Sequence, residues 1–184
     1  MQNKLFLVIL FFPLSIFTCA ELNSLNIFSE DTKTISLDYI QSFKEKNKLN
    51  IKGKVYFKKP SLFKITTSEP SKTELIVNYQ DVFRTDYELN ETIKHKLENI
   101  EFQIPALLLL KSKPKACNFL KNTEKSEFIT DVNIISKKDS LNKITYKDQF
   151  GTITQITFFD IKLNDELDKK IFDYNKSSSL IILN

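Results

Sequence analysis

The sequence Gly-Lys-Val-Tyr-Phe-Lys-Lys-Pro-Ser-Leu-Phe, residues 53–63, predicts a β-strand, a break at the proline and a second strand that begins at once. Side chains alternate along a strand, so Gly53, Val55, Phe57 and Lys59 share one face. A charge that continues an apolar face is costly unless it finds a partner or water. Two interpretations stay open: Lys59 reaches water from the strand end, or this face lines a cavity and Lys59 lies at its mouth.

A secretory signal peptide is predicted over residues 1–20. Lys4 precedes an apolar run over residues 5–17, and Thr18-Cys19-Ala20 supplies a small-residue cleavage site. The run is shorter than the roughly 18 residues that indicate a membrane span. A lipid anchor on Cys19 is the alternative, although residues 16–18 fit a lipoprotein signal poorly. We therefore expect an exported chain that begins at Glu21.

Residues 21–184 are expected to form a single domain. Cleavage would remove Cys19 and leave Cys117 as the one cysteine, so we expect no internal disulfide and a Cys117 that acts as a small buried apolar residue. The net charge of +4 is spread along the chain, and every basic residue except Arg84 is a lysine. Without a dense basic stripe, the composition argues against a nucleic-acid partner.

Alternating polar and apolar residues predict a mainly β protein. Eleven or so strands are expected, over residues 34–44, 49–58, 62–67, 74–79, 82–88, 92–97, 127–136, 141–147, 152–163, 170–174 and 180–183. Residues 148–151 form a hairpin turn in which Gly151 is free to take positive φ. A long antiparallel meander of this kind curls, and with short helices over one face it becomes an incomplete half-barrel.

Short helical segments are expected between the strands. Pro105 and the leucines after it predict a buried helix over residues 104–111, and residues 116–122 add a further turn. Residues 164–167 suit a capped helical turn, and residues 21–29 suit either a short helix or an extended lead-in.

No catalytic or metal-binding pattern is present in the sequence. His95 is the one histidine and lies among charged residues, so neither a nucleophile–histidine pair nor a zinc site can be built around it. The two glycines are too few for a phosphate-binding loop. We expect no enzyme activity, no cofactor and no metal.

Sixteen phenylalanines and the leucine run over residues 107–110 are more apolar residues than one sheet and a small helix need. The surplus suggests an apolar cavity in a concave sheet face.

Several motifs, in the same order, resemble the periplasmic outer-membrane lipoprotein carrier family (LolA). The motifs are Tyr39-Ile40-Gln41-Ser42-Phe43, Gly53 with Lys59-Pro60-Ser61-Leu62-Phe63, Pro105-Ala106-Leu107-Leu108-Leu109, the strand at 128–136, the hairpin at 144–156 with Asp148 and Gly151, and Asp168 with Phe172-Asp173-Tyr174. The resemblance implies a strongly curved antiparallel half-barrel with a helical lid over an apolar cavity. It also implies a non-enzymatic carrier in the periplasm of a Gram-negative bacterium.

Such a carrier takes acylated lipoproteins from an inner-membrane releasing transporter, shields their acyl chains and passes them to an outer-membrane acceptor. Lys59 matches the gate position that is usually an arginine, and Asn78-Tyr79 replaces the usual Asp-Gly turn. A lysine latches a lid more weakly than the planar fork of an arginine. We expect a monomer. The alternative is a binding or sensor module of the same fold for a glycolipid or another exported protein, anchored through Cys19.

We expect the cavity to be lined by apolar side chains from the strands and the lid, with Lys59 as the gate. The lining residues are Val55, Phe57, Phe63, Ile65, Phe83, Leu107, Leu108, Leu110, Ile156 and Phe158. For Phe83, Ile156 and Phe158, ordinary core packing is the competing interpretation.

Overall fold

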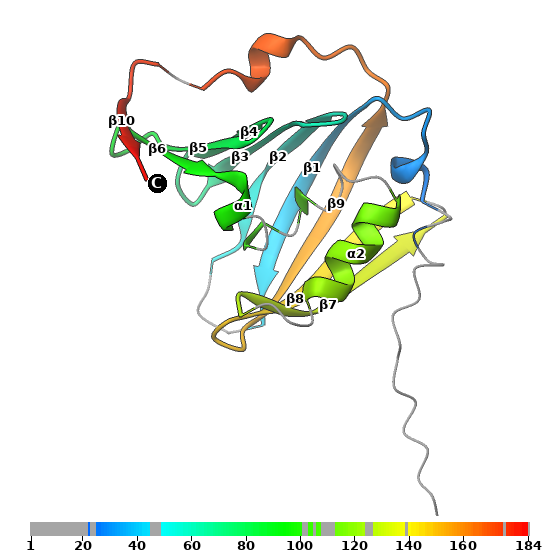
Figure 1. Ribbon diagram of the computed structural model, residues 1–184. Coiled ribbons are helices and arrows are strands. Elements are labelled where there is room, and N and C mark those ends of the chain that lie inside the picture. The colour runs from blue at the N-terminus through cyan, green and yellow to red at the C-terminus, as the bar shows by residue number, and fades with distance from the viewer. Residues whose placement is uncertain are drawn as a thin grey trace, which may run out of the picture.

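Ten strands form one sheet in the computed structural model, which describes residues 22, 25–44, 49–100, 103–104, 106–107, 113–123, 127–138, 140–174 and 176–183. The strand order is β10-β6-β5-β4-β3-β2-β1-β9-β8-β7 (Figure 1). Every neighbouring pair is antiparallel except β10 and β6, which are parallel. The strands are β1 (Thr34–Phe43), β2 (Ile51–Lys58), β3 (Leu62–Glu69), β4 (Thr73–Asn78), β5 (Asp81–Asp86), β6 (Glu91–Lys96), β7 (Ile129–Lys137), β8 (Ser140–Asp148), β9 (Ile153–Leu163) and β10 (Ser179–Ile182).

The sheet is mainly antiparallel, as expected, but it is neither closed nor strongly curled. Figure 1 shows β10 and β7 at opposite sides of the sheet, so the two edge strands do not meet. Gly53 is the one glycine within the described strands, and the register shifts in the pairs β1–β9, β2–β3 and β7–β8 do not bring the two edge strands together. The strongly curved half-barrel that we expected is instead an open sheet flanked by short helical segments.

Short helical segments accompany the sheet in the described part of the chain. Those with two or more described residues are the 3₁₀ helix η2 (Asn26–Phe28), a 3₁₀ segment at residues 106–107, helices α1 (Leu97–Ile100) and α2 (Lys113–Thr123), and the 3₁₀ helix η5 (Lys169–Phe172). Helix α2 has Pro114 in its first turn, where the missing N–H costs nothing, and it runs further in both directions than the turn expected at 116–122. It packs against β7.

The strand expected at residues 170–174 was wrong, because these residues belong to η5 and the segment after it. The Asp168 carboxylate accepts a hydrogen bond from the Lys170 backbone N–H at 2.9 Å and caps this helix. The helical turn expected at 164–167 is not formed, so the capped turn lies a few residues later than predicted.

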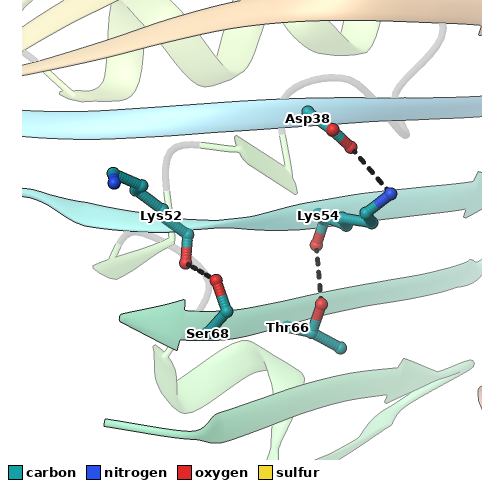
Figure 2. Close-up of polar contacts among 5 residues, drawn as sticks. All are labelled: Asp38, Lys52, Lys54, Thr66 and Ser68. Atoms are coloured by element: carbon teal, nitrogen blue, oxygen red, sulfur yellow. Dashed lines mark hydrogen bonds and ion pairs between the residues drawn. The ribbon is translucent and has the colours of Figure 1, made fainter. Parts of the chain in front are cut away.

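One face of the sheet is apolar and the other is largely polar. Figure 2 shows the polar face across β1 to β3: Lys54 pairs with Asp38 at 3.4 Å, and Thr66 donates to the Lys54 carbonyl at 3.5 Å. Ser68 donates to the Lys52 carbonyl at 3.2 Å in the same view. Lys64 and Glu74 form a mostly buried ion pair, 2.6 Å apart, on this face. The apolar face is therefore the one that carries the core.

Two further findings concern the expectations about export. Cys117 is half-buried on α2. In this structure of the full chain it is disulfide-bonded, and it therefore has no free thiol. The expectation for a cleaved chain is untested, because Cys19 lies outside the described residues. Among the helices that the structure describes, none has the length and apolar character needed to span a bilayer.

Candidate functional site

Two cross-strand rows of apolar side chains form the centre of the apolar face. Residues directly opposite each other in an antiparallel pair point to the same side, so the register defines each row. The first row is Ile35, Phe57, Phe63, Val77 and Val82, and the second is Leu37, Val55, Ile65 and Leu75.

The middle of this face is tightly packed. Val55, Phe57 and Phe63 are each 0% exposed, and the Phe57 and Phe63 rings tilt by 56° with centroids 5.0 Å apart. The alternation that residues 53–63 predicted is thus confirmed for β2 and β3.

Gly53 lies opposite Tyr39 in the same face. A Cβ built on Gly53 would lie 1.8 Å from the Thr66 carbonyl oxygen and 2.8 Å from Cε1 of Tyr39. The ring of Tyr39 occupies the space that a side chain would need, and its hydroxyl lies 3.1 Å from Oγ1 of Thr67. Burial raises the pKa of this phenol, and the Thr67 hydrogen bond only partly opposes that effect.

Separate segments of the chain cover this face. The N-terminal segment supplies Leu22, Leu25, Ile27 and Phe28, each at most 3% exposed. Buried side chains from residues 106–107 and from α2 complete the core, namely Ala106, Leu107, Ala116, Phe119 and Leu120. These cover segments are joined to the sheet mainly by side-chain packing, because none of them is a strand of it.

Lys59 connects the end of β2 to the N-terminal cover. Its Nζ donates to the carbonyls of Ile27 at 2.9 Å and Ser29 at 3.2 Å, which lie within and just after η2. Its backbone N–H donates to the Lys33 carbonyl at 2.9 Å. Burial lowers the pKa of the Lys59 amine, and the nearby charge of Lys33 lowers it further. The side chain is half-buried and bonded, so it does not extend freely into water.

Most of the expected site residues meet on this face. Val55, Phe57, Phe63 and Ile65 lie in the central rows, and Phe158 pairs with Tyr39 while Ile156 pairs with Gln41 of β1. Leu107 reaches the same core from the cover and is 2% exposed. Leu108 and Leu110 lie outside the described residues.

Phe83 does not join the others. It pairs with Ile76 and Lys94 on the opposite face of the sheet, where its ring stacks on Tyr174 with centroids 4.3 Å apart and planes 8° from parallel. The pairing of Val77 with Val82 places Val82 on the apolar face and therefore turns Phe83 away from it.

The sequence analysis did not identify the N-terminal residues that cover this face. Residues 21–29 were expected only as a helix or lead-in, although Leu22, Leu25 and Phe28 recur every third residue. That spacing matches the three residues per turn of a 3₁₀ helix and was the available signal. Ile35, Leu37 and Tyr39 of β1 were also not predicted to belong to this face, although they alternate along one strand and therefore point to the same side of the sheet.

The side chains that meet at this site are mainly apolar and form a packed core. His95 is half-buried opposite Val82, and no group of three or more His, Cys, Asp or Glu side chains that could hold a metal occurs among the residues described. On the described face the cover segments pack directly on the sheet, and Lys59 is the polar link between the sheet and the N-terminal cover.

A family model, "Outer membrane lipoprotein carrier protein LolA", matches residues 30–175 of this chain. The chain belongs to the LolA family. An outer-membrane lipoprotein carrier protein from Pseudomonas aeruginosa is 29% identical over 138 residues, which cover 67% of this chain and 66% of that protein. One from Francisella philomiragia is 27% identical over 139 residues, which cover 68% of each chain. The match to the Pseudomonas relative thus spans just under two thirds of its length.

Solved structures agree with the LolA-like fold. A LolA superfamily protein from Nitrosomonas europaea aligns with a TM-score of 0.53 at 10% identity, over 84% of this chain and 96% of that one. An uncharacterized conserved protein from Thermus thermophilus aligns with a TM-score of 0.52 at 8% identity, over 89% of this chain and 98% of that one. LolA proteins are periplasmic carriers that handle lipoproteins and are not enzymes.

Proposed function

We propose that this LolA protein carries lipoproteins from the inner to the outer membrane by holding their acyl chains against the apolar face of the sheet. The observation that carries the proposal is the construction of this face. Its central residues are fully buried. The segments that bury them are separate from the sheet, and the Lys59 side chain bonds one of these segments to the end of β2.

The covers explain how one site can bind hydrocarbon and also release it. Each buried methylene contributes about 0.8 kcal/mol, so acyl chains do not cross water unshielded. A cover that leaves the sheet exposes apolar surface, and an acyl chain that takes its place removes that surface from water again. Because acyl binding replaces the contact between cover and sheet, the net binding free energy is smaller than the free energy of burying the acyl chain alone.

The proposed binding residues are those that share the face or cover it: Val55, Phe57, Phe63, Ile65, Leu107, Ile156 and Phe158. Lys59 acts as the gate, because opening the N-terminal cover breaks its two hydrogen bonds to Ile27 and Ser29. A lysine offers one point charge to these carbonyls, so this latch is weaker than one made by an arginine.

Export and handover complete the proposed function. Residues 1–20 act as a cleavable signal peptide that directs the chain to the periplasm. The cargo then arrives from a lipoprotein-releasing transporter of the inner membrane and leaves to an acceptor in the outer membrane. Family membership supports both steps.

A release assay tests the proposal. Residues 21–184 are incubated with inner-membrane vesicles that contain an acylated lipoprotein and the releasing transporter, and lipoprotein in the supernatant is measured. Phe57→Asp should abolish release, because an unpaired carboxylate replaces a ring at the centre of the face. Phe150→Asp is the matched control, since Phe150 is 82% exposed in a turn and its replacement should leave release unchanged.

Because Phe57 is fully buried, circular dichroism must show that the variant folds. Ile65→Asp repeats the test at a half-buried position of the same face, where folding is less at risk. Normal release by a folded Phe57→Asp or Ile65→Asp variant would contradict the proposed site. Binding of a diacyl glycolipid in place of lipoprotein would instead favour the glycolipid-binding alternative.

A further inference from the structure

A cavity of about 500 Å³ lies on the polar face of the sheet, opposite the apolar rows. It is bounded by the turn that joins β4 to β5, by the start of β5, by the end of β6 and by the segment after η5, which runs from β9 across to β10 (Figure 1). Val77 and Val82 point to the apolar face, so the register turns Asn78, Asp81 and Phe83 toward the cavity. The volume falls within the range of small-molecule sites.

One wall of the cavity is flat and aromatic. The ring of Tyr174 stacks on the ring of Phe83, with centroids 4.3 Å apart and planes 8° from parallel. Lys94 Nζ lies 5.5 Å from the centroid of Phe83, and Phe172, which also lines the cavity, is 1% exposed. Because Phe83 occupies one face of the Tyr174 ring, the other face is the one that a ligand in the cavity can contact.

The polar side chains of the lining offer both hydrogen-bond donors and acceptors. Asn78 and Gln80 each carry an amide, which has two N–H donors and a carbonyl acceptor. Within the described part of the chain, no hydrogen bond joins either of these side chains to another residue. The Tyr174 hydroxyl adds a group that both donates and accepts. These groups can therefore bond to the hydroxyls of a ligand.

The charges of the lining cancel. Asp81 and Asp173 supply two carboxylates, and Lys96 and Lys176 supply two ammonium groups. Asp81 Oδ1 lies 2.9 Å from Lys96 Nζ, and Asp81 Oδ2 lies 2.9 Å from Lys94 Nζ. The hydrogen bond from Lys96, followed by that from Lys94, lowers the pKa of Asp81, so this carboxylate stays ionised and can accept further hydrogen bonds. The cavity is therefore polar without favouring a charged ligand.

The turn at the opening of the cavity is strained. Tyr79 has a φ of 57°, in the left-handed region that a bulky side chain rarely adopts. Its side chain lines the cavity and is nonetheless 67% exposed. Conformations of this kind cluster at binding sites, where the surrounding structure holds a side chain in place for a ligand. Here the turn presents a second aromatic ring at the opening.

We propose that this cavity binds a neutral saccharide of one or two rings. A sugar ring carries C–H groups on its faces and hydroxyls around its edge. The C–H face lies on the free side of the Tyr174 ring, because the electron-rich face of an aromatic ring attracts polarised C–H groups. The hydroxyls bond to the amides of Asn78 and Gln80 and to the Asp81 carboxylate.

The construction of the cavity favours a saccharide over other classes of ligand. An extended peptide needs an open backbone edge, but β4 and β5 each have a strand neighbour on both sides. An acyl chain would leave the amides and charges of the lining unpaired. An anion would face the two carboxylates, and a cation would face the two ammonium groups. The inference does not depend on lipid binding, because the cavity and the apolar rows lie on opposite faces of the sheet.

An NMR titration of the isotope-labelled full chain tests the proposal. The probes are three neutral disaccharides, namely maltose, lactose and N,N′-diacetylchitobiose, and glucuronic acid is the charged comparator. We expect at least one disaccharide to cause saturable shifts in the side-chain amide signals of Asn78 and Gln80 and in the backbone amide signal of Tyr174. The signals of Gln149, in the turn between β8 and β9, should not move. No saturable shift from any of the three, or equal shifts from glucuronic acid, would overturn the proposal.

Gln80→Ala and Tyr174→Leu test the location of the site. Gln80 is exposed in a turn, so its replacement leaves the fold intact, and Gln149→Ala is the matched control at another exposed glutamine in a turn. Each site variant should weaken binding about tenfold, whereas Gln149→Ala should not change it. Tyr174→Phe keeps the ring and should bind within about threefold of the wild type. Full affinity in both site variants, or an equal loss in Gln149→Ala, would overturn the proposal.

Two sources can supply such a saccharide, a glycan chain and the head group of a glycolipid. The disaccharide that binds is therefore compared with its longer oligosaccharide and with its dodecyl glycoside, and the shifts at Gln80 and Tyr174 are followed in each case. Tighter binding of the oligosaccharide assigns the cavity to a glycan chain, and tighter binding of the dodecyl glycoside assigns it to a glycolipid. Equal affinity for all three identifies a free sugar as the ligand. Each of these results supports the saccharide site and identifies its source.

Discussion

Gly53 shows how a single position holds the apolar face together. The ring of Tyr39 lies over it from β1 and the Thr66 carbonyl closes in from β3, so the backbone has no room for a side chain. A tyrosine that covers a glycine in a neighbouring strand keeps the sheet continuous at this point. The packing of β1, β2 and β3 therefore depends on this one glycine.

Gly53→Ala should destabilise the fold by about 3 kcal/mol or more, because the new methyl group overlaps backbone rather than a flexible side chain. Urea unfolding followed by circular dichroism measures the change. Gly151→Ala is the matched control: Gly151 has a φ of 78° and nothing within 4 Å of a built Cβ, so the cost is about 1 kcal/mol. Equal losses for the two variants would refute the steric account.

Lys59→Leu should loosen the N-terminal cover without unfolding the sheet. It removes both hydrogen bonds to the carbonyls of Ile27 and Ser29, a loss of about 1–2 kcal/mol, which corresponds to roughly 5–30-fold faster local opening. Hydrogen exchange at the Phe28 and Ser29 amides, which are bonded within this turn, measures that opening.

Lys58→Leu is the control for this change, because the Lys58 amine bonds to the Leu167 carbonyl and not to the cover. The Lys59 variant should also transfer cargo abnormally while the Lys58 variant transfers it normally. Unchanged exchange at Phe28 in Lys59→Leu would remove Lys59 from the latch.

Buried tyrosines predict a loss of stability at alkaline pH. Burial raises the pKa of both Tyr39 and Tyr146 above the usual value of 10.0. The unfolded chain then loses these protons first, so the stabilisation is complete below about pH 10 and is lost as pH rises through the folded-state values.

Urea midpoints from about pH 9 to about pH 11 check this prediction. The lowered pKa of Lys59 acts in the opposite direction just below 10.5, because there the unfolded chain holds more protons. The difference between wild type and a Tyr39→Phe/Tyr146→Phe double variant isolates the tyrosines. A difference that does not vary with pH would contradict the assignment.

The strands were largely predictable because their signal is local. Period-two alternation in residues 53–63 defined both β2 and β3 to within a few residues, and Asp148 and Gly151 defined the turn between β8 and β9. Phe83 could not be placed, because Val82 and Phe83 are both apolar and only the register with β4 decides which one faces the core. The η5 segment was mistaken for a strand because its cap, Asp168, was not recognised.

Helix η5 holds the segment after β9 against the polar face. Phe172 is 1% exposed there, and η5 contacts β3 and β4. Phe172→Ala should therefore destabilise the protein by about 3–5 kcal/mol in urea unfolding. Phe150→Ala, at an 82% exposed ring, should cost less than about 0.5 kcal/mol. Because Phe172 lies on the opposite face from the proposed site, the folded variant should still bind acyl chains. A loss below about 1 kcal/mol would show that η5 is not an anchor.

For the molecule as a whole, the sequence-based prediction was closer for the kinds of secondary structure than for the curvature of the sheet. One mainly antiparallel sheet with short helices was predicted, but the sheet is open where a strongly curved half-barrel was expected. Curvature and cover packing depend on contacts between distant parts of the chain. Ile27 and Lys59, for example, lie 32 residues apart. The apolar face could be predicted from parity, and Leu107 was expected in its cover, whereas the contact of the N-terminal segment with this face was not predicted.

The central claim is that the apolar face holds the acyl chains of a lipoprotein. Native mass spectrometry tests it most directly, on residues 21–184 mixed with a purified acylated lipoprotein and, in parallel, with the same polypeptide lacking its acyl chains. We predict one acylated polypeptide bound per chain and no complex with the unacylated form. Equal binding of the two forms, or no complex with the acylated one, would contradict the account.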